Sequence, residues 1–344
     1  MKLAIGIGYS GGKVELPLDM ILRAEQLGYD SLWSAEAYGS DAVTPLAYLA
    51  AQTSRIKLGT GILQIPARTP AMCAMTMSTL DALSGGRVIV GLGMSGPQVI
   101  EGWHGMPYSR PAARIREYVE ILHKIWDREE PVSLNGKVYQ MPYQGEDATG
   151  LGKPLKSILH SRRLPVYLAT MKPLSIRITA ELADGWLPIW YSPYRMDMFK
   201  TDLEKGFSKA GNGKSLENFD IMAGCTVVIG DDIKACLAQL KPTLALYIGG
   251  MGAKGKNFHN EMVSKYGYAE VASEIQDLYL SGKKQEAIQR IPDELCDEIS
   301  LCGPPERIRE RFGVWEKAGV STMMVQSSQP EALELMADIA GTRG

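Results

Sequence analysis

The stretch Ile56–Pro70, IKLGTGILQIPARTP, decides the fold of this chain. An apolar strand runs into Gly59 and Gly61 and then, at Pro70, directly into a helix. Proline suits the first turn of a helix, and glycine permits irregular backbone at the end of a strand. The stretch is therefore typical of a barrel strand whose C-terminal end is deformed to hold a ligand.

Three other short apolar segments end in the same way, in Gly, Ser or an acidic residue. They are LAIGIGYS from Leu3, SLWSAEAYGSD from Ser31 and RVIVGLGMSG from Arg87. Polar residues and glycines at the same end of successive parallel strands form an active-site rim.

Composition bounds the class of protein. The chain has 344 residues, more than the roughly 250 of a typical (β/α)8 barrel but within the range of barrels with insertions. Hydrophobic residues make up 45% and charged residues 22%, enough for a large core. The net charge is −2 and basic residues are not clustered, which argues against nucleic acid as a partner.

Location and redox state follow from two further patterns. The chain has no run of about 18 apolar residues and begins at once with strand-like sequence, so we expect a cytoplasmic protein that does not contact a membrane. The five cysteines are scattered and form no CxxC pair, which argues against a disulfide framework and against a metal site.

Strands and helices alternate along the chain, which indicates a parallel sheet. The expected strands are 3–8, 31–36, 56–63, 88–93, 166–169, 185–190, 219–229 and a last strand in STMMVQSS. The expected helices include 17–27, 45–53, 70–83, 173–183 and 193–210. No GxGxxG opens a helix after the first strand, and GLGMSG at Gly91 lacks the third glycine, which disfavours a dinucleotide-binding sheet.

We therefore predict an α/β protein in which residues 1–344 form one (β/α)8 TIM-barrel domain. Two insertions, about 130–164 and 242–299, break the alternation and are expected over the C-terminal rim. The first contains VSLNGKVYQMP, which is typical of a hairpin around Asn135-Gly136.

Several strings, in order over nearly the whole chain, resemble the luciferase-like monooxygenase superfamily and, within it, the oxidoreductases that depend on the deazaflavin coenzyme F420. They are LWSAEAYGSD, LGTGILQIPARTPAM, GLGMSGPQVIEGWHG, ADGWLPIW and CGPPERIRERFGVWEKAGVSTMMV. The resemblance implies a TIM barrel with the cofactor at the C-terminal rim, and a homodimer.

The resemblance also implies a cis peptide bond at the end of the third strand, as a backrest for the central deazaflavin ring. The matching bond is Gly61–Ile62, beside Thr60. A cis bond before a non-proline residue costs about 3 kcal/mol, and glycine removes the Cβ clash that would raise this cost. From the residues alone, a glycine bulge with trans geometry is the alternative.

The coenzyme carries a phosphate and a glutamate tail, so the resemblance requires elements that bind anions. The matching positions after the fifth strand are Ala169, Thr170, Met171 and Lys172, where a helix N-terminus offers free N–H groups. Those after the fourth strand are Met94, Ser95 and Gly96. The alternative for Lys172 is a solvated lysine on the surface that binds no ligand.

The chain departs from its sugar-phosphate and alcohol dehydrogenase relatives at two positions. Those enzymes carry a histidine after the acidic residue of the second strand, where this chain has Ala37 after Glu36. They also carry a glutamate where this chain has Gly96. Oxidation of an alcohol needs a base for the hydroxyl proton, so that reaction is disfavoured here.

Glu36 is the first candidate catalytic residue because it follows a strand at the rim, where it could hydrogen-bond the cofactor or relay a proton. Bonding a rim N–H is its alternative, structural role. His104 is the second candidate. Tyr38 and Trp190 are candidates for the pocket wall, and Met72, Met75 and Met77 for barrel packing or a dimer interface.

The sequence thus favours an oxidoreductase that passes a hydride between coenzyme F420 and a small organic substrate. One alternative is an FMN-dependent monooxygenase supplied by a reductase partner. A second is a flavin or deazaflavin-binding protein without catalysis, and a third is a cofactor-free phosphosugar isomerase or lyase on the same barrel.

Overall fold

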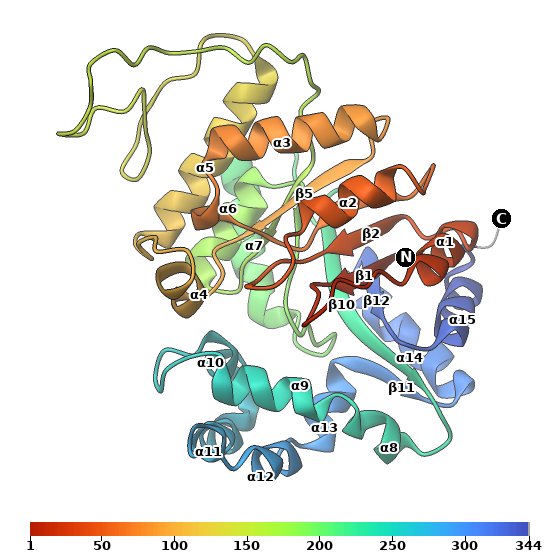
Figure 1. The fold of residues 1–344 in the computed structure, drawn as a ribbon. Coiled ribbons are helices and arrows are strands. Elements are labelled where there is room, and N and C mark those ends of the chain that lie inside the picture. The colour runs from red at the N-terminus through yellow and green to blue at the C-terminus, as the bar shows by residue number, and fades with distance from the viewer. Residues whose placement is uncertain (343–344) are drawn as a thin grey trace.

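The computed structural model describes residues 1–342, and its centre is a closed barrel of eight parallel strands (Figure 1). Each strand pairs with its neighbours in the chain, and the last strand pairs with the first to close the ring, with Lys2 opposite Thr322. The barrel strands are β1 Lys2–Gly8, β2 Ser31–Ser34, β3 Lys57–Thr60, β5 Val88–Gly93, β8 Val166–Ala169, β9 Gly185–Trp186, β10 Asp220–Ile229 and β12 Thr322–Gln326. The predicted (β/α)8 barrel is confirmed.

Helices follow the barrel strands and form the outer layer (Figure 1). They are α1 Leu18–Gln26, α2 Val43–Ala50, α3 Pro70–Leu83, α4 Pro97–Gly102, α5 Pro111–Asp127, α6 Pro173–Leu182, α7 Asp197–Ala210, α8 Ile233–Ala238, α14 Pro305–Lys317 and α15 Pro330–Ala340. The structure reproduces the predicted ends of α3 and β5, because proline, glycine and an uninterrupted apolar run mark them clearly.

Four strands differ from the sequence expectation. β2 ends at Ser34 instead of Glu36, and the strand expected over 56–63 is interrupted after Thr60. β9 stops at Trp186 instead of Trp190, because Pro188 has no N–H for the ladder and Trp190 adopts a φ of 45°. β11, Ser300–Gly303, was not expected. It pairs with the last four residues of β10, of which the last three extend beyond the pairing of β10 with β12.

The apolar core has two parts. The larger part packs the helices against the outside of the barrel. The smaller part fills the barrel interior with Ala4, Trp33, Ile89, Tyr167, Leu187 and Met222, and Ile62, Ala169 and Met324 pack against it. The barrel is therefore a filled core and not a channel, so a ligand must bind at one of its ends.

The third strand carries one extra residue relative to its neighbour. Leu58 pairs with Val88 in β5, but after the interruption Leu63 in β4 Leu63–Gln64 pairs with Leu92, so the register offset falls from 30 to 29. An extra residue on one strand is a β-bulge, which bends the strand and ends regular pairing. A short 3₁₀ turn, η1 Ile65–Ala67, then leads into α3.

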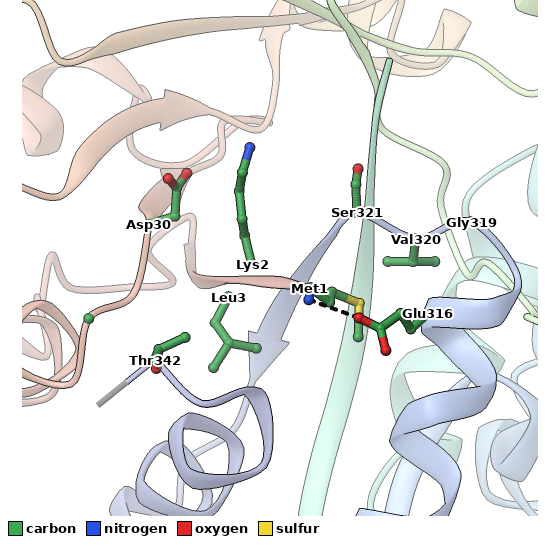
Figure 2. Close-up of a pocket in the computed structure, with 10 residues that line it drawn as sticks. Met1, Lys2, Leu3, Asp30, Glu316, Gly319, Val320, Ser321 and Thr342 are labelled. Carbon is green, nitrogen blue, oxygen red and sulfur yellow. Dashed lines mark hydrogen bonds and ion pairs between the residues drawn. The ribbon is translucent and has the colours of Figure 1, made fainter. Parts of the chain in front are cut away.

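The N-terminal end of the barrel holds a pocket of about 700 Å³ (Figure 2). Met1 and Lys2 line it, and the amino group of Met1 donates to Glu316 Oε1 at 3.0 Å. Beside it, Asp220 accepts hydrogen bonds from Tyr167 and Thr322. This end lies opposite the strand termini that build barrel active sites, so we assign it to stability.

The two segments predicted as insertions differ in structure. Residues after α5 form the antiparallel hairpin β6 Leu134–Asn135 and β7 Gln140–Met141, whose loop N–H groups donate to Glu117 of α5. Figure 1 shows this segment extending away from the barrel.

The second segment is mostly helical and forms one group beside the barrel in Figure 1. It contains α9 Lys241–Ala245, η2 Leu246–Gly250, α10 Phe258–Val263, η3 Ser264–Tyr268, α11 Ala269–Leu280, α12 Lys284–Gln289 and α13 Asp293–Glu298. Both η2 and η3 are π-helical turns, a rare conformation that is frequent at functional sites. Among residues 1–342, no helix has the length and apolar character needed to cross a membrane.

We predict that Gly91→Ala destabilises the barrel by about 3 kcal/mol, because an added Cβ would lie 1.8 Å from the backbone oxygen of Thr60. Urea denaturation followed by circular dichroism measures the loss. The matched control is Gly313→Ala in α14, where the added Cβ meets no atom within 4 Å and should stabilise the helix by up to about 1 kcal/mol. Equal stability of the two variants would contradict this account.

Candidate active site at the barrel rim

The predicted site residues follow the C-terminal ends of neighbouring barrel strands. Glu36 follows β2, Gly61 follows β3, Met94 follows β5 and Ala169 ends β8. Because these strands are parallel and adjacent in the barrel, their ends meet on one rim. The structure therefore brings the sequence candidates from four strands to the same end of the molecule.

The Gly61–Ile62 peptide bond is cis. The N–H of Gly61 donates to the carbonyl of Ser34 at 2.7 Å, which ties the bulge to β2. The side chain of Ile62 packs on the barrel interior, and the partly exposed Gly61 presents backbone without a side chain. Of the two geometries that the sequence left open, the one implied by the resemblance is present.

The side chain of Thr60 replaces the backbone hydrogen bonds that this bulge interrupts between the third strand and β5. Its hydroxyl donates to the carbonyl of Gly91 and accepts from the N–H of Gly91, both at 2.9 Å, and the side chain is fully buried. The bulge would otherwise leave both Gly91 groups without partners on the β3 side. The hydroxyl of Thr60 is thus committed to β5, and its predicted contact with a cofactor stays a prediction.

Glu36 is almost completely buried, with its side chain 7% exposed, and it is surrounded by donors. One carboxylate oxygen accepts from Arg68 and from the N–H of Gln64 at 3.1 Å, and the other accepts from the N–H of Ala42 at 3.2 Å. Burial alone would lower the pKa of Arg68, but the hydrogen bond and charge of Glu36 outweigh it and raise that pKa. Glu36 therefore makes the contacts expected for a structural role, in which it accepts hydrogen bonds from N–H groups at the rim.

Gln64 connects the two predicted catalytic residues. Its amide nitrogen donates to the carbonyls of Glu36 and Ala37 at 3.3 Å each, and its Oε1 lies 2.6 Å from Nε2 of His104. The two carbonyls fix the orientation of the amide, so Nε2 of His104 must carry the proton. The other ring nitrogen, Nδ1, is then the proton acceptor of the neutral ring.

Sequence reasoning did not select Gln64 or Arg68, although both lie in the stretch quoted first. Gln64 is 1% exposed. A polar residue within the apolar run ILQIP and an arginine four residues later were the available signals. Both side chains turn toward Glu36 because the bulge displaces the strand end, which residue periodicity does not reveal.

The loop after β5 is held in an unusual conformation. Ser95 has a φ of 57°, in the left-handed region, and its carbonyl accepts from the hydroxyl of Tyr108 at 3.2 Å. Gly96 then precedes the first residue of α4, while Met94 is buried. At the rim, this loop therefore presents the backbone of Ser95 and Gly96. That this backbone binds the cofactor stays a prediction.

The four residues predicted to bind the cofactor at the end of β8 have different surroundings. Thr170 is buried, with its hydroxyl 2.6 Å from that of Thr179 and its carbonyl bonded to the indole N–H of Trp186. Met171 is partly buried. Lys172 is 65% exposed at the start of α6, and its Nζ lies 3.7 Å from Glu261 of α10. The cation and the N-terminus of α6 face the same end of the barrel, and no side chain caps this helix.

The five cysteines are buried free thiols. Burial raises the pKa of Cys73 to about 11, so this thiol is unreactive at neutral pH. Within residues 1–342, no group of three or more His, Cys, Asp or Glu side chains is arranged to hold a metal ion.

The fold and the rim define a parallel (β/α)8 barrel protein with a modified third strand at its C-terminal end. Residues 6–322 match the family described as luciferase-like monooxygenase. The chain therefore belongs to the luciferase-like monooxygenase family.

Relatives within this family cover nearly the whole chain. A protein of Mycobacterium tuberculosis named "Putative coenzyme F420-dependent oxidoreductase Rv3520c" is 46% identical over 340 residues, which is 98% of each chain. The 5,10-methylenetetrahydromethanopterin reductase of Archaeoglobus fulgidus is 27% identical over 88% of this chain and 87% of that protein. The solved coenzyme F420-dependent tetrahydromethanopterin reductase of Methanopyrus kandleri superposes with a TM-score of 0.77 at 24% identity, over 98% of this chain and 97% of that chain.

We predict that Arg68→Met destabilises the protein by about 3 kcal/mol, because it leaves the buried Glu36 carboxylate without its cation. Urea denaturation at pH 7 measures the change. Arg309→Met is the matched control, since Arg309 pairs with Asp338 at 2.7 Å on the surface and its loss should cost less than about 1 kcal/mol. A similar small loss for both variants would show that Glu36 does not depend on Arg68.

Proposed function

We propose that this protein binds coenzyme F420 at the barrel rim and transfers a hydride between the coenzyme and a small organic substrate. Family membership, the relative named as a putative coenzyme F420-dependent oxidoreductase and the relative named as a 5,10-methylenetetrahydromethanopterin reductase support an oxidoreductase of this class. The observation that carries the proposal is the 46% identity, over 98% of each chain, to a relative named as a coenzyme F420-dependent oxidoreductase, together with the family match over residues 6–322. FMN is the alternative cofactor, since a structural neighbour, the oxygenating constituent of 3,6-diketocamphane monooxygenase from Pseudomonas putida, was solved in complex with FMN.

The residues present fit a deazaflavin with an anionic tail. Gly61 offers an exposed backbone edge, and an added Cβ there would have only the ring of Trp33 as a neighbour, at 3.6 Å. Lys172 and the uncapped N-terminus of α6 supply positive charge one strand away from the loop of Ser95 and Gly96. The 3.7 Å pair of Lys172 with Glu261 is exposed and weak, so the lysine is available to a phosphate.

When bound, the coenzyme supplies a hydride at C5 of its ring, and the protein must orient the substrate and handle a proton. His104 is the proposed proton carrier, because Gln64 holds its Nε2–H and leaves Nδ1 free to exchange a proton. The role of Glu36 in proton transfer stays a prediction. Its buried contacts favour a role in fixing Gln64 and Arg68.

Two positions favour reduction of an unsaturated acceptor over oxidation of an alcohol. Ala37 and Gly96 carry no proton-transfer groups at the positions used by alcohol dehydrogenases of this family. Reduction of a C=C or C=N bond demands less of the protein, because one proton donor suffices.

Fluorescence titration with coenzyme F420 and, in parallel, with FMN tests the proposal. We expect saturable binding of F420 and at least tenfold weaker binding of FMN. Preference for FMN, with oxygen consumption on reduction, would replace hydride transfer by monooxygenase chemistry. Binding of F420 without turnover over a broad panel of acceptors would favour the non-catalytic alternative.

We predict that His104→Asn lowers kcat by about 100-fold, because general acid catalysis contributes on the order of 10²-fold or more. The dissociation constant of F420 should change by less than about threefold, since the lost group acts on the proton. His160→Asn, at an exposed histidine of the first insertion, is the control and should leave kcat unchanged. An unchanged kcat in His104→Asn would leave water as the proton source.

The homodimer implied by the resemblance also stays a proposal. Of the three methionines on α3, Met77 is buried in the barrel packing, whereas Met72 and Met75 are more than half exposed. Tyr48 of the neighbouring α2 is also 52% exposed, so these helices offer an apolar face to a second copy. Light scattering of the purified protein distinguishes dimer from monomer.

A further inference from the structure

Trp190 occupies a constrained position just after β9 at the rim. Its φ is 45°, which is uncommon for a bulky residue and persists only where the surroundings enforce it. Its carbonyl accepts from the hydroxyl of Tyr266 at 3.1 Å. Tyr266 belongs to η3, so a π-helical turn of the second insertion holds the backbone of Trp190.

Two other rings of the same insertion pack against the indole. The ring centroids of Tyr247 and His259 lie 5.7 and 5.2 Å from that of Trp190, and 4.8 Å from each other. Tyr247 comes from η2 and His259 from α10. We name these three residues the aromatic wall. Both π-helical turns therefore act on Trp190, one through its carbonyl and one through its ring.

Asn257 fixes the geometry of the aromatic wall. Its side chain is 1% exposed, donates to the carbonyls of Tyr247 and Ile248 at 2.9 Å, and accepts from the N–H of His259 at 2.9 Å. A single buried amide thus connects η2 to α10. This rigid arrangement is what precise recognition of a flat ligand requires.

The aromatic wall reaches across the barrel mouth. Burial raises the pKa of Tyr247, and Tyr9, which follows β1, raises it further by hydrogen bonding and charge. The more distant charge of Tyr38, which lies after β2, adds to the same effect. Tyr9 and Tyr38 are 39% and 54% exposed, so aromatic surface beside the wall is open to a ligand. The side chain of Tyr9, after β1, thus meets Tyr247 of the wall over the rim.

The wall carries no positive charge. Burial lowers the pKa of His259 to about 4, so its ring is neutral at pH 7. Two cations lie beside residues of the insertion. Lys172 is proposed to bind the phosphate of the coenzyme, and Arg195, which stacks over Tyr266 at 5.1 Å, bonds to Glu298. With the coenzyme bound, neither of these two cations is available to a phosphate or carboxylate on the substrate.

We propose that the aromatic wall of Trp190, Tyr247 and His259 binds a planar, uncharged, conjugated substrate, such as an aryl enone, over the rim. This inference rests on the proposed function. The C=C bond of the enone gains a hydride at one carbon and a proton at the other, and the reduced deazaflavin loses the two electrons. The three rings meet at interplanar angles of 54° to 79°, so a flat aromatic ligand would contact the face of one ring and the edge of another, while an anionic analogue would be desolvated without a counter-ion.

Ligand binding separates this inference from the proposed function. Saturation-transfer NMR measures binding of benzylideneacetone, a neutral aryl enone, and of cinnamate, its anionic counterpart, with and without bound F420. We expect benzylideneacetone to bind at least tenfold more tightly than cinnamate. Trp190→Leu and Tyr247→Leu should each weaken it roughly 3- to 10-fold, the range for loss of one aromatic contact.

Trp190→Phe, which keeps a ring, should restore most of the affinity. Tyr143→Leu in the first insertion removes an exposed tyrosine outside the wall and should change nothing. Equal binding of the two probes, binding of neither, or unchanged affinity in both leucine variants would overturn the inference. If F420 fails to bind, the proposed function fails, and the probes still test the wall on the protein alone.

Discussion

The site depends on the hydroxyl of Thr60. The extra residue in the third strand removes the ladder partners of Gly91, and Thr60 supplies both a donor and an acceptor in their place. Because the backbone of Thr60 occupies the space where a Cβ would stand, only glycine fits opposite. A strand that would otherwise continue regular pairing can therefore be interrupted inside a closed barrel, and the interruption exposes Gly61 at the rim.

The interruption has a second consequence, because it redirects the residues that follow it. Gln64 and Arg68 turn to Glu36, and Gln64 then reaches His104 from another strand end. The partly buried contacts of Glu36 are charge-assisted, and together with the neutral contact between Gln64 and His104 they fix the loops after β2, β3 and β5 relative to one another. The rim is rigid on this side, whereas the opposite side is built by an insertion that packs on Trp190.

The sequence predicted the barrel well because each element is locally marked. Prolines begin α3 and α6, glycines end strands, and apolar runs of four to six residues lie between them. Glu36 could be placed at the rim for the same reason, whereas Gly61 and Lys172 were selected through the family resemblance. The aromatic wall could not, because Tyr247 and His259 lie in the second insertion and meet Trp190 only through tertiary packing. The sequence did not reveal the role of Gln64, because this residue lies in an apparently apolar strand end.

These contacts show how the rim is built without a histidine after Glu36. At Ala37 the backbone carbonyl accepts from Gln64, and the same amide orients His104 through its other end. An imidazole is thus present at the rim, but it comes from the loop after the fourth barrel strand instead of the second. Its proton-bearing nitrogen is fixed by a neutral amide and not by a carboxylate, so the ring keeps a neutral neighbour. This arrangement supports the proposed exchange of one proton between His104 and an uncharged acceptor, as do the aromatic rings beside the rim.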